Sequence, residues 1–187
     1  MSTALLVMDY QSAIVAQMQD PTPLLDNVAA AIETARSHGA YIGFVRVAFT
    51  HAEYDAVPNS NKGFTAAKAS GRDFRDGSPA TAIFERIAPK EGDIVVRKIR
   101  VGAFSTTDLH GRLRERNVDT LILSGISTSG VVLSTVRDAA DRDYRLFVLS
   151  DACADPQPDV HAFLIEKIFP RQADVITCGD LGSILSS

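Results

Sequence analysis

Two charged residues that closely follow short apolar runs are the first candidates for chemistry in this sequence. Asp9 comes directly after the apolar run 4–8, and Lys98 comes two positions after the run 94–96. A carboxyl group beside an amine can take up or release a proton while the amine balances its charge. Position alone also allows simpler interpretations, in which Asp9 caps the following turn and Lys98 is solvated at a strand end.

The segment GISTSG at positions 125–130 is the next candidate, because it links an apolar run to a predicted helix. Its small residues bring backbone N–H groups to a helix N-terminus, where they can bind an anion or an oxyanion. The candidate donors are Ile126, Ser127 and Gly130. The segment is not a nucleophile elbow, since Ser129 stands where the pattern G-x-S-x-G requires glycine.

The four histidines do not indicate a catalytic triad. His38 ends a predicted helix, and His51, His110 and His161 are expected on surfaces or loop edges. None has a convincing acid partner, so we reject a Ser-His-Asp hydrolase. The sequence also lacks Walker A, dinucleotide-binding G-x-G-x-x-G and H-E-x-x-H motifs.

Short apolar runs that alternate with amphipathic stretches predict the elements that position these residues. The runs lack a period of two, which is typical of parallel strands buried on both faces. We expect strands at residues 4–8, 41–47, 94–96, 121–123, 146–149 and 175–176. We expect helices at residues 23–38, 105–116, 129–142 and 158–169, with Ser105 and Ser129 as N-caps of the second and third.

The alternation of strands and helices predicts an α/β fold, with an open parallel sheet and helices on both faces. Ligands of such folds bind beyond the carboxyl ends of the strands. Segment 48–92 has no steady period and is too long for an ordinary connection. We expect it to form a lid or a pocket-lining excursion that contains short helices.

Length and composition are typical of one globular domain, covering residues 1–187. Hydrophobic residues make up 45% of the chain, and the net charge is −4. The negative charge argues against nucleic-acid and membrane partners, and no apolar run approaches the length of a membrane-spanning helix. The two cysteines, Cys153 and Cys178, form neither a disulfide framework nor a zinc motif. We therefore expect a cytoplasmic protein that binds a small molecule and needs no cofactor or metal.

Three motifs, in this order, resemble those of the isochorismatase-like hydrolases, also called the cysteine hydrolase family. They are ALLVMDYQ at 4–11, VVRKIRVGAFSTTDLHGRL at 95–113 and LILSGISTSGVVLSTVRDAADRDYRLFVLSDACAD at 121–155. The resemblance covers nearly the whole chain. It implies a Rossmann-like sheet of about six parallel strands in the order 3-2-1-4-5-6, and a non-proline cis peptide near 125–127. It also implies a homodimer or homotetramer.

The resemblance implies that Asp9 and Lys98 take the first two places of the Asp-Lys-Cys triad found in the amidases of this family. The place of the cysteine is occupied by Val131, which cannot act as a nucleophile. We expect Cys153 to follow the fifth strand and Cys178 the last one, both as packing residues. A hydroxyl group within 127–129 is the remaining nucleophile candidate, and it would need a general base.

Isochorismatases proper also lack the thiol, and there the Asp is thought to act as a general acid on a vinyl ether. They have glycine where this chain has Val131, so the pocket is expected to be narrower here. The sequence thus favours a hydrolase of a small carbonyl or vinyl-ether compound, with Asp9 and Lys98 in acid–base roles and no covalent thiol intermediate. The alternative is a catalytically silent homologue that binds a small molecule or regulates. A thiol-dependent amidase ranks third.

Four further residues are candidates for substrate binding: Arg46, Phe49, Arg100 and Phe104. The arginines would favour an anionic or carbonyl-bearing substrate and the phenylalanines a planar one, although ion-pair and core roles are equally open. The zinc-binding nicotinamidases of the family have an Asp-x-His…His pattern after the second strand. This chain has RVAFTH at 46–51 instead, so we expect no metal.

Overall fold

Alternate side chains of the first strand enter two different apolar layers, which explains why this strand is hydrophobic along its length. In the computed structural model, which describes residues 2–186, strand β1 runs from Ser2 to Met8. Leu6 and Met8 belong to one buried cluster, whereas Leu5 and Val7 belong to the cluster on the opposite side. A strand buried on both faces belongs in the middle of a covered parallel sheet.

The six strands pair in parallel and in the order β3-β2-β1-β4-β5-β6, as predicted. After β1 they are β2 (Tyr41–Val47), β3 (Ile94–Lys98), β4 (Val118–Ile126), β5 (Arg145–Ala154) and β6 (Asp174–Ile176). Strands β1 and β4 are neighbours in the middle of the sheet. The residues that follow them therefore meet at the carboxyl ends of the strands. Asp9 and the segment 125–130 are therefore brought together.

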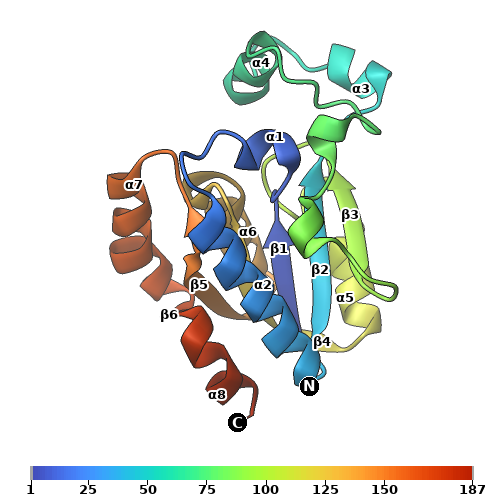
Figure 1. Cartoon of the computed structure of the whole chain (residues 1–187). Helices are drawn as coiled ribbons and strands as arrows, with labels where there is room; N and C mark the ends of the chain where they lie inside the picture. The colour runs from blue at the N-terminus through green and yellow to red at the C-terminus, as the bar shows by residue number, and fades with distance from the viewer. Residues whose placement is uncertain (1, 187) are drawn as a thin grey trace.

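Helices cover both faces of the sheet, as Figure 1 shows. The α-helices are α1 (Ser12–Val15), α2 (Thr22–Ser37), α3 (His51–Asp55), α4 (Lys62–Ala69), α5 (Leu109–Glu115), α6 (Leu133–Ala140), α7 (Pro158–Phe163) and α8 (Leu181–Leu185). The apolar cluster under α2 and α8 fills one face, and the cluster under α5 and α6 fills the other. The prediction of helices on both faces is confirmed.

Shorter helical turns complete the described chain. They are η1 (Pro79–Thr81), η2 (Glu85–Ile87), η5 (Phe169–Arg171) and η6 (Cys178–Asp180), which are 3-10 helices, and the π-helical turns η3 (Thr128–Val132) and η4 (Leu164–Ile168). None of the helices within residues 2–186 is both long and apolar enough to cross a membrane.

Two predicted helix starts are wrong. The helix expected from Ser105 begins at Leu109 with Asp108 as its N-cap, because the Ser105 hydroxyl donates to the carbonyl of Gly102 instead of capping. The helix expected from Ser129 begins as the turn η3, whose N-cap is Ser127 without a side-chain bond. Helix α2, in contrast, agrees with its prediction to within a residue at each end.

Strand β5 is longer than predicted, because its pairing with β4 contains an irregularity. Leu123 pairs with Val148, but two residues later Gly125 pairs with Cys153. The extra residues of β5 carry the strand on to Ala154. Cys153 therefore lies within the strand and packs in the core, where the sequence placed it after the strand.

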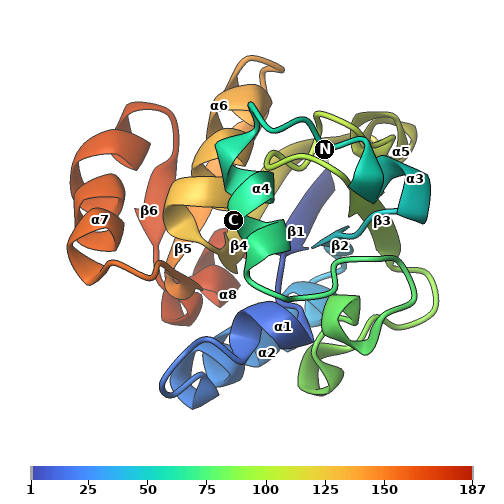
Figure 2. The same cartoon turned by 90° about the horizontal axis from the view of Figure 1, so that it is seen from above.

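Segment 48–92 extends beyond the carboxyl ends of the strands and contains short helices, as expected. Figure 1 shows α3 and α4 above the strand ends, and Figure 2 shows α4 over β1 and β4. A small apolar cluster that includes Phe49 and Phe74 packs inside this segment. Gln11 ties this segment to the ends of the strands. Its side-chain amide donates to the carbonyls of Val47 and Thr81 at 2.9 Å each, and its Oε1 accepts from the N–H of Val47 at 2.7 Å.

Candidate functional site

A buried ion pair joins the two charged residues that follow β1 and end β3. The Nζ of Lys98 lies 2.8 Å from Oδ2 of Asp9, and the two residues are only 2% and 6% exposed. Asp9 has a φ of +61°, a left-handed conformation that aspartate tolerates better than most residues. The structure thus brings together the two side chains that the sequence singled out, and the solvated and turn-capping interpretations do not describe them.

The ammonium group of Lys98 is fully occupied by this arrangement. Besides Asp9, it donates to the carbonyl oxygens of Arg100 at 3.2 Å and Val101 at 2.9 Å. An ammonium group has three N–H donors, so none remains for a substrate. Lys98 can therefore hold a positive charge beside Asp9, but in this geometry it cannot also donate to a ligand.

The carboxyl group of Asp9 retains one unsatisfied oxygen. Oδ1 is buried and has no hydrogen-bond partner among the described residues. Burial raises the pKa of Asp9, and the nearby Lys98 charge only partly opposes this rise. A carboxyl group whose pKa is raised in this way can hold a proton and deliver it in an acid–base step.

The turn after β4 passes unusually close to the strands beside it. The peptide bond between Ile126 and Ser127 is cis, as the family resemblance implied. A Cβ atom at Gly125 would lie 3.1 Å from the carbonyl oxygen of Met8 and 3.0 Å from Cγ2 of Val132. Only glycine leaves enough room at position 125 for this approach.

Only part of the predicted oxyanion site is available. The N–H of Gly130 donates to the carbonyl of Ser127 at 3.2 Å, so it is already engaged. The N–H of Ser127 makes no hydrogen bond within the described part of the chain. Ser127 therefore offers a free donor at the turn, whereas Ile126 lies at the last position of β4.

Val131, which the family resemblance places at the nucleophile position, is only 2% exposed and packs in the apolar core. Val101 connects this turn to the ion pair. Its carbonyl accepts from Lys98, and its Cγ1 would lie 3.9 Å from a Cβ atom at Gly130. The turn that carries Val131 and the Asp9–Lys98 pair are therefore neighbours.

A hydroxyl–imidazole pair on this turn was not predicted. Oγ1 of Thr128 lies 2.8 Å from Nδ1 of His161, and Asp155 accepts the N–H of Ser129 at 2.7 Å. Burial lowers the pKa of His161, while the charge of Asp155 partly opposes the shift. The Thr128 side chain is fully buried, so this hydroxyl does not face a substrate.

Two of the histidines expected on surfaces or loop edges also contact other side chains. His161 and His110 are both half-buried, and His110 lies 3.0 Å from the hydroxyl of Tyr144. Both contacts join residues more than thirty positions apart, as the spacings of 33 and 34 show. Nothing in the local sequence indicates such a contact.

Neither cysteine has the environment of a nucleophile. Burial raises the pKa of Cys153 to about 12. Cys178 begins η6, after the last strand as predicted, and burial raises its thiol pKa even further above the ordinary range. Thiols with such pKa values are almost entirely protonated at neutral pH and react slowly.

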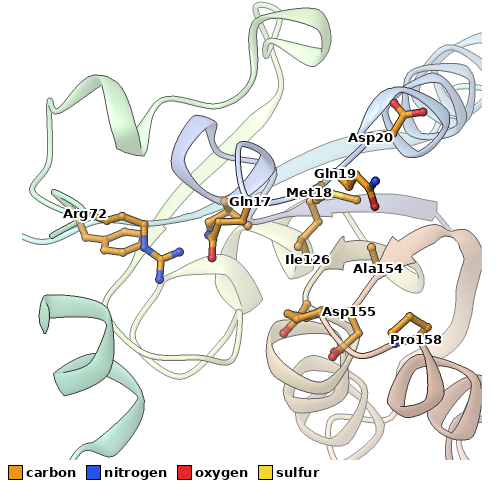
Figure 3. A pocket seen from close by; sticks show the side chains of 13 residues that line it. Gln17, Met18, Gln19, Asp20, Arg72, Ile126, Ala154, Asp155 and Pro158 are labelled. Carbon is orange, nitrogen blue, oxygen red and sulfur yellow. The ribbon is translucent and has the colours of Figure 1, made fainter. Parts of the chain in front are cut away.

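A cavity of about 860 Å³ lies between the strand ends and segment 48–92. In Figure 3, Arg72 and Gln17 point into it from one side, while Asp155 and Ala154 lie on the other. Its thirteen lining residues are Ile14, Gln17, Met18, Gln19, Asp20, Arg72, Phe74, Ile126, Ser127, Ala154, Asp155, Pro156 and Pro158. Asp9 and Lys98 are not among them, so the buried ion pair does not border this cavity.

The four predicted substrate-binding residues do not line this cavity. Arg46 forms an ion pair with Asp76 at 2.7 Å and borders a smaller hollow of about 410 Å³. Phe49 lies in the apolar cluster of segment 48–92, and Phe104 stacks on Tyr144. Arg100 donates to the carbonyl of Ile99. Their role in binding remains a prediction.

Metal binding has no obvious support in the described chain. Among residues 2–186, no three His, Cys, Asp or Glu side chains are grouped so as to hold a metal ion. The expectation that the protein needs no metal remains a prediction.

Comparisons with known proteins agree with this architecture. Residues 3–180 match the isochorismatase domain family. The chain is 33% identical to the uncharacterized isochorismatase family protein YwoC of Bacillus subtilis, over 90% of this chain and 86% of that protein. It is 30% identical to the ureidoacrylate amidohydrolase RutB of Methylobacterium radiotolerans, over 84% of this chain and 69% of that enzyme. An isochorismatase family structure from Burkholderia thailandensis superposes with a TM-score of 0.83 at 26% identity, covering 100% of this chain and 96% of that one.

Proposed function

Because the chain belongs to the isochorismatase family, whose members are hydrolases, we propose that it hydrolyses a small carbonyl or vinyl-ether compound without a covalent thiol intermediate. Asp9 and Lys98 carry the chemistry in this proposal. The observation that supports it best is their buried ion pair, which leaves Oδ1 of Asp9 without a partner in the described chain. A buried carboxyl oxygen without a partner is free to exchange a proton with a reacting atom that reaches it.

Asp9 acts as a general acid in this mechanism. With a vinyl ether, its carboxyl proton goes to the enol-ether carbon, and a water molecule adds to the oxocarbenium ion that results. The hemiketal then breaks down to a carbonyl compound and an alcohol, and a proton returns to Asp9. Lys98 balances the negative charge that Asp9 carries between the two proton transfers.

Two observations support a mechanism without a thiol. The family resemblance places the buried Val131 at the nucleophile position, and burial keeps the thiol of Cys153 protonated at neutral pH. The N–H of Ser127 is a candidate donor to a developing oxyanion, because it is unoccupied and its residue lines the cavity. The relative named as an amidohydrolase is consistent with a carbonyl substrate.

A substrate screen with one matched pair of variants tests this proposal. Isochorismate, nicotinamide and simple carbamoyl and ester compounds are offered to the wild type, to Asp9→Asn and to Asp143→Asn. Asp143 has the same φ of +61° as Asp9 but is exposed, so it controls for the change from aspartate to asparagine in this conformation. We expect Asp9→Asn to abolish turnover and Asp143→Asn to retain it. Activity that survives in Asp9→Asn would contradict the role of Asp9.

A second candidate function is small-molecule binding without turnover. It is favoured by the position of Asp9, which is only 6% exposed and does not line the large cavity. In that case no compound of the screen is hydrolysed, but one that binds raises the melting temperature. We further propose a cytoplasmic homodimer or homotetramer, as the family resemblance implied, and sedimentation velocity would measure its size.

A further inference from the structure

Arg72 is the one cationic side chain among the residues that line the large cavity. Its Nε donates to the hydroxyl of Ser70 at 2.8 Å, and its guanidinium carbon lies 5.6 Å from the centre of the Phe74 ring. These two contacts hold the planar group on the wall formed by segment 48–92. The two terminal nitrogens of Arg72 make no hydrogen bond to any residue within 2–186.

Arg72 differs in this respect from every other arginine between positions 46 and 97. There are five arginines in that range, and the other four form ion pairs with a carboxylate. The pairs are Arg46–Asp76, Arg75–Asp73, Arg86–Asp26 and Arg97–Glu53. This part of the chain thus leaves a single guanidinium group without a counter-ion, and that group points into the cavity (Figure 3).

The two carboxylates that line the cavity are already bonded to backbone groups. Asp155 accepts the N–H groups of Ser129 and Gln157, at 2.7 and 3.2 Å. Asp20, which is exposed, accepts the N–H of Thr22 at 3.0 Å. Both carboxylates are thus hydrogen-bonded where they stand, whereas the terminal nitrogens of Arg72 are charged donors of the cavity lining that have no partner among residues 2–186.

We propose that Arg72 binds a carboxylate group of the ligand, so that the cavity selects small acids. This inference rests on the proposed function in one respect. It assumes that the hydrolysed bond lies near the N–H of Ser127, across the cavity from Arg72. The fork of N–H donors on a guanidinium group matches the two oxygens of a carboxylate. Apolar side chains, Ile14 and Met18 among them, line the space between and would contact the connecting carbon atoms.

Paired ligands that differ in one charge test this proposal. The probes are malonamate, succinamate and glutaramate, each compared with its neutral diamide by calorimetric titration of the wild type. We expect at least one acid to bind at least tenfold more tightly than its diamide. Arg72→Gln should weaken binding of that acid about tenfold or more, because a charge-assisted pair is lost.

Two further variants separate the role of Arg72 from general effects of charge. Arg75→Gln removes a nearby arginine that pairs with Asp73 and does not line the cavity, so we expect the affinity to stay unchanged. Arg72→Lys retains the charge but not the fork of donors, and we expect an intermediate affinity. Equal affinity for each acid and its diamide, no binding of any acid, or an unchanged affinity in Arg72→Gln would each overturn the proposal.

Ammonia release, measured in the same samples, distinguishes this proposal from the proposed function. If an acid binds through Arg72 but is not hydrolysed, the carboxylate-binding role of Arg72 is supported. Hydrolysis of an amide as the proposed function then fails. If wild type and Arg72→Gln hydrolyse the acid with equal efficiency, the proposed hydrolase function is supported and the carboxylate-binding role of Arg72 fails.

Discussion

Thr128 and His161 lie 33 residues apart and share a hydrogen bond of 2.8 Å, which ties helix α7 to the turn after β4. That turn also carries Val131 and the N–H of Ser127, which has no partner within residues 2–186. The side chain of His161 thus supports the backbone of the candidate site without facing a substrate. Because imidazole titrates near neutral pH, this support depends on pH.

We predict that His161 makes the protein less stable as the pH falls below about 6.5. Burial lowers the pKa of His161 from its ordinary value of 6.5, so the unfolded chain binds this proton more readily than the folded protein. Stability from this group is therefore present above pH 6.5 and is lost as the pH falls. His161→Asn offers an amide in place of Nδ1 and does not titrate.

The test is the melting temperature of wild type and variants between pH 8 and pH 5. As the pH falls, we expect the melting temperature of His161→Asn to decrease less than that of the wild type. His51 is exposed at the start of α3, so the melting temperature of His51→Asn should decrease as much as that of the wild type. Equal slopes for wild type and His161→Asn would contradict the prediction.

A second prediction concerns the coupling between Asp9 and Lys98. Each single change, Asp9→Asn or Lys98→Met, leaves the other charge buried without its partner and should destabilise the fold by about 3 kcal/mol. The double variant should cost clearly less than the sum of the two, because neither charge remains. Urea unfolding of the four proteins measures this coupling.

The exposed pair Arg142–Asp138 provides the control for that cycle. Its side chains are 34% and 31% exposed, so Asp138→Asn should cost only about 0.5 kcal/mol. Strict additivity of the Asp9 and Lys98 changes would show that the buried pair is not coupled.

A third prediction is that Val131→Cys creates a reactive thiol. The new side chain would lie where the turn after β4 leads into helix α6, and the N-terminus of a helix lowers a thiol pKa. We expect alkylation by iodoacetamide near neutral pH, faster than that of Cys153. Val132→Cys, which sits one position further in the same core cluster, is the matched control and should stay unreactive. An unreactive Val131→Cys would mean that the position is not that of the family nucleophile.

A fourth prediction uses two glycines whose surroundings differ. Gly125→Ala should destabilise the protein by about 1–3 kcal/mol, because the new Cβ would meet the carbonyl of Met8 at 3.1 Å and the side chain of Val132 at 3.0 Å. Gly111 lies inside helix α5, where an added Cβ atom would have nothing within 4 Å, so Gly111→Ala should stabilise by up to about 1 kcal/mol. Chemical denaturation measures both, and a neutral Gly125→Ala would contradict the tight packing of this turn.

Local patterns predicted a parallel sheet and singled out Asp9 and Lys98, whereas the strand order and the pairing of the two residues were implied by the family resemblance. Asp9 and Lys98 lie at the ends of continuous apolar runs, and parallel strands place such ends at one edge. The late end of β5 could not be predicted, since it depends on an irregular register with β4.

Other parts of the site depend on contacts between distant segments, which no local pattern indicates. Arg72 lies in a region without periodicity, and only the folded chain shows that it lines the cavity and has no counter-ion among residues 2–186. The hydroxyl of Ser105 illustrates the opposite failure: it fits the pattern of a helix cap but bonds to the carbonyl of Gly102 instead. Local signals predict that a helix exists more reliably than where it begins.

The hydrogen bonds of the Gln11 side chain hold the two ends of the loop between Val47 and Thr81 close to the ion pair. This side chain fixes Val47 and Thr81, the two points where the polypeptide leaves the sheet and comes back toward it, and Gln11 stands only two residues after Asp9. We therefore expect that the intervening loop can be remodelled while the Asp9–Lys98 pair keeps its place. A protein engineer could treat that loop as a replaceable part mounted on a constant ion pair.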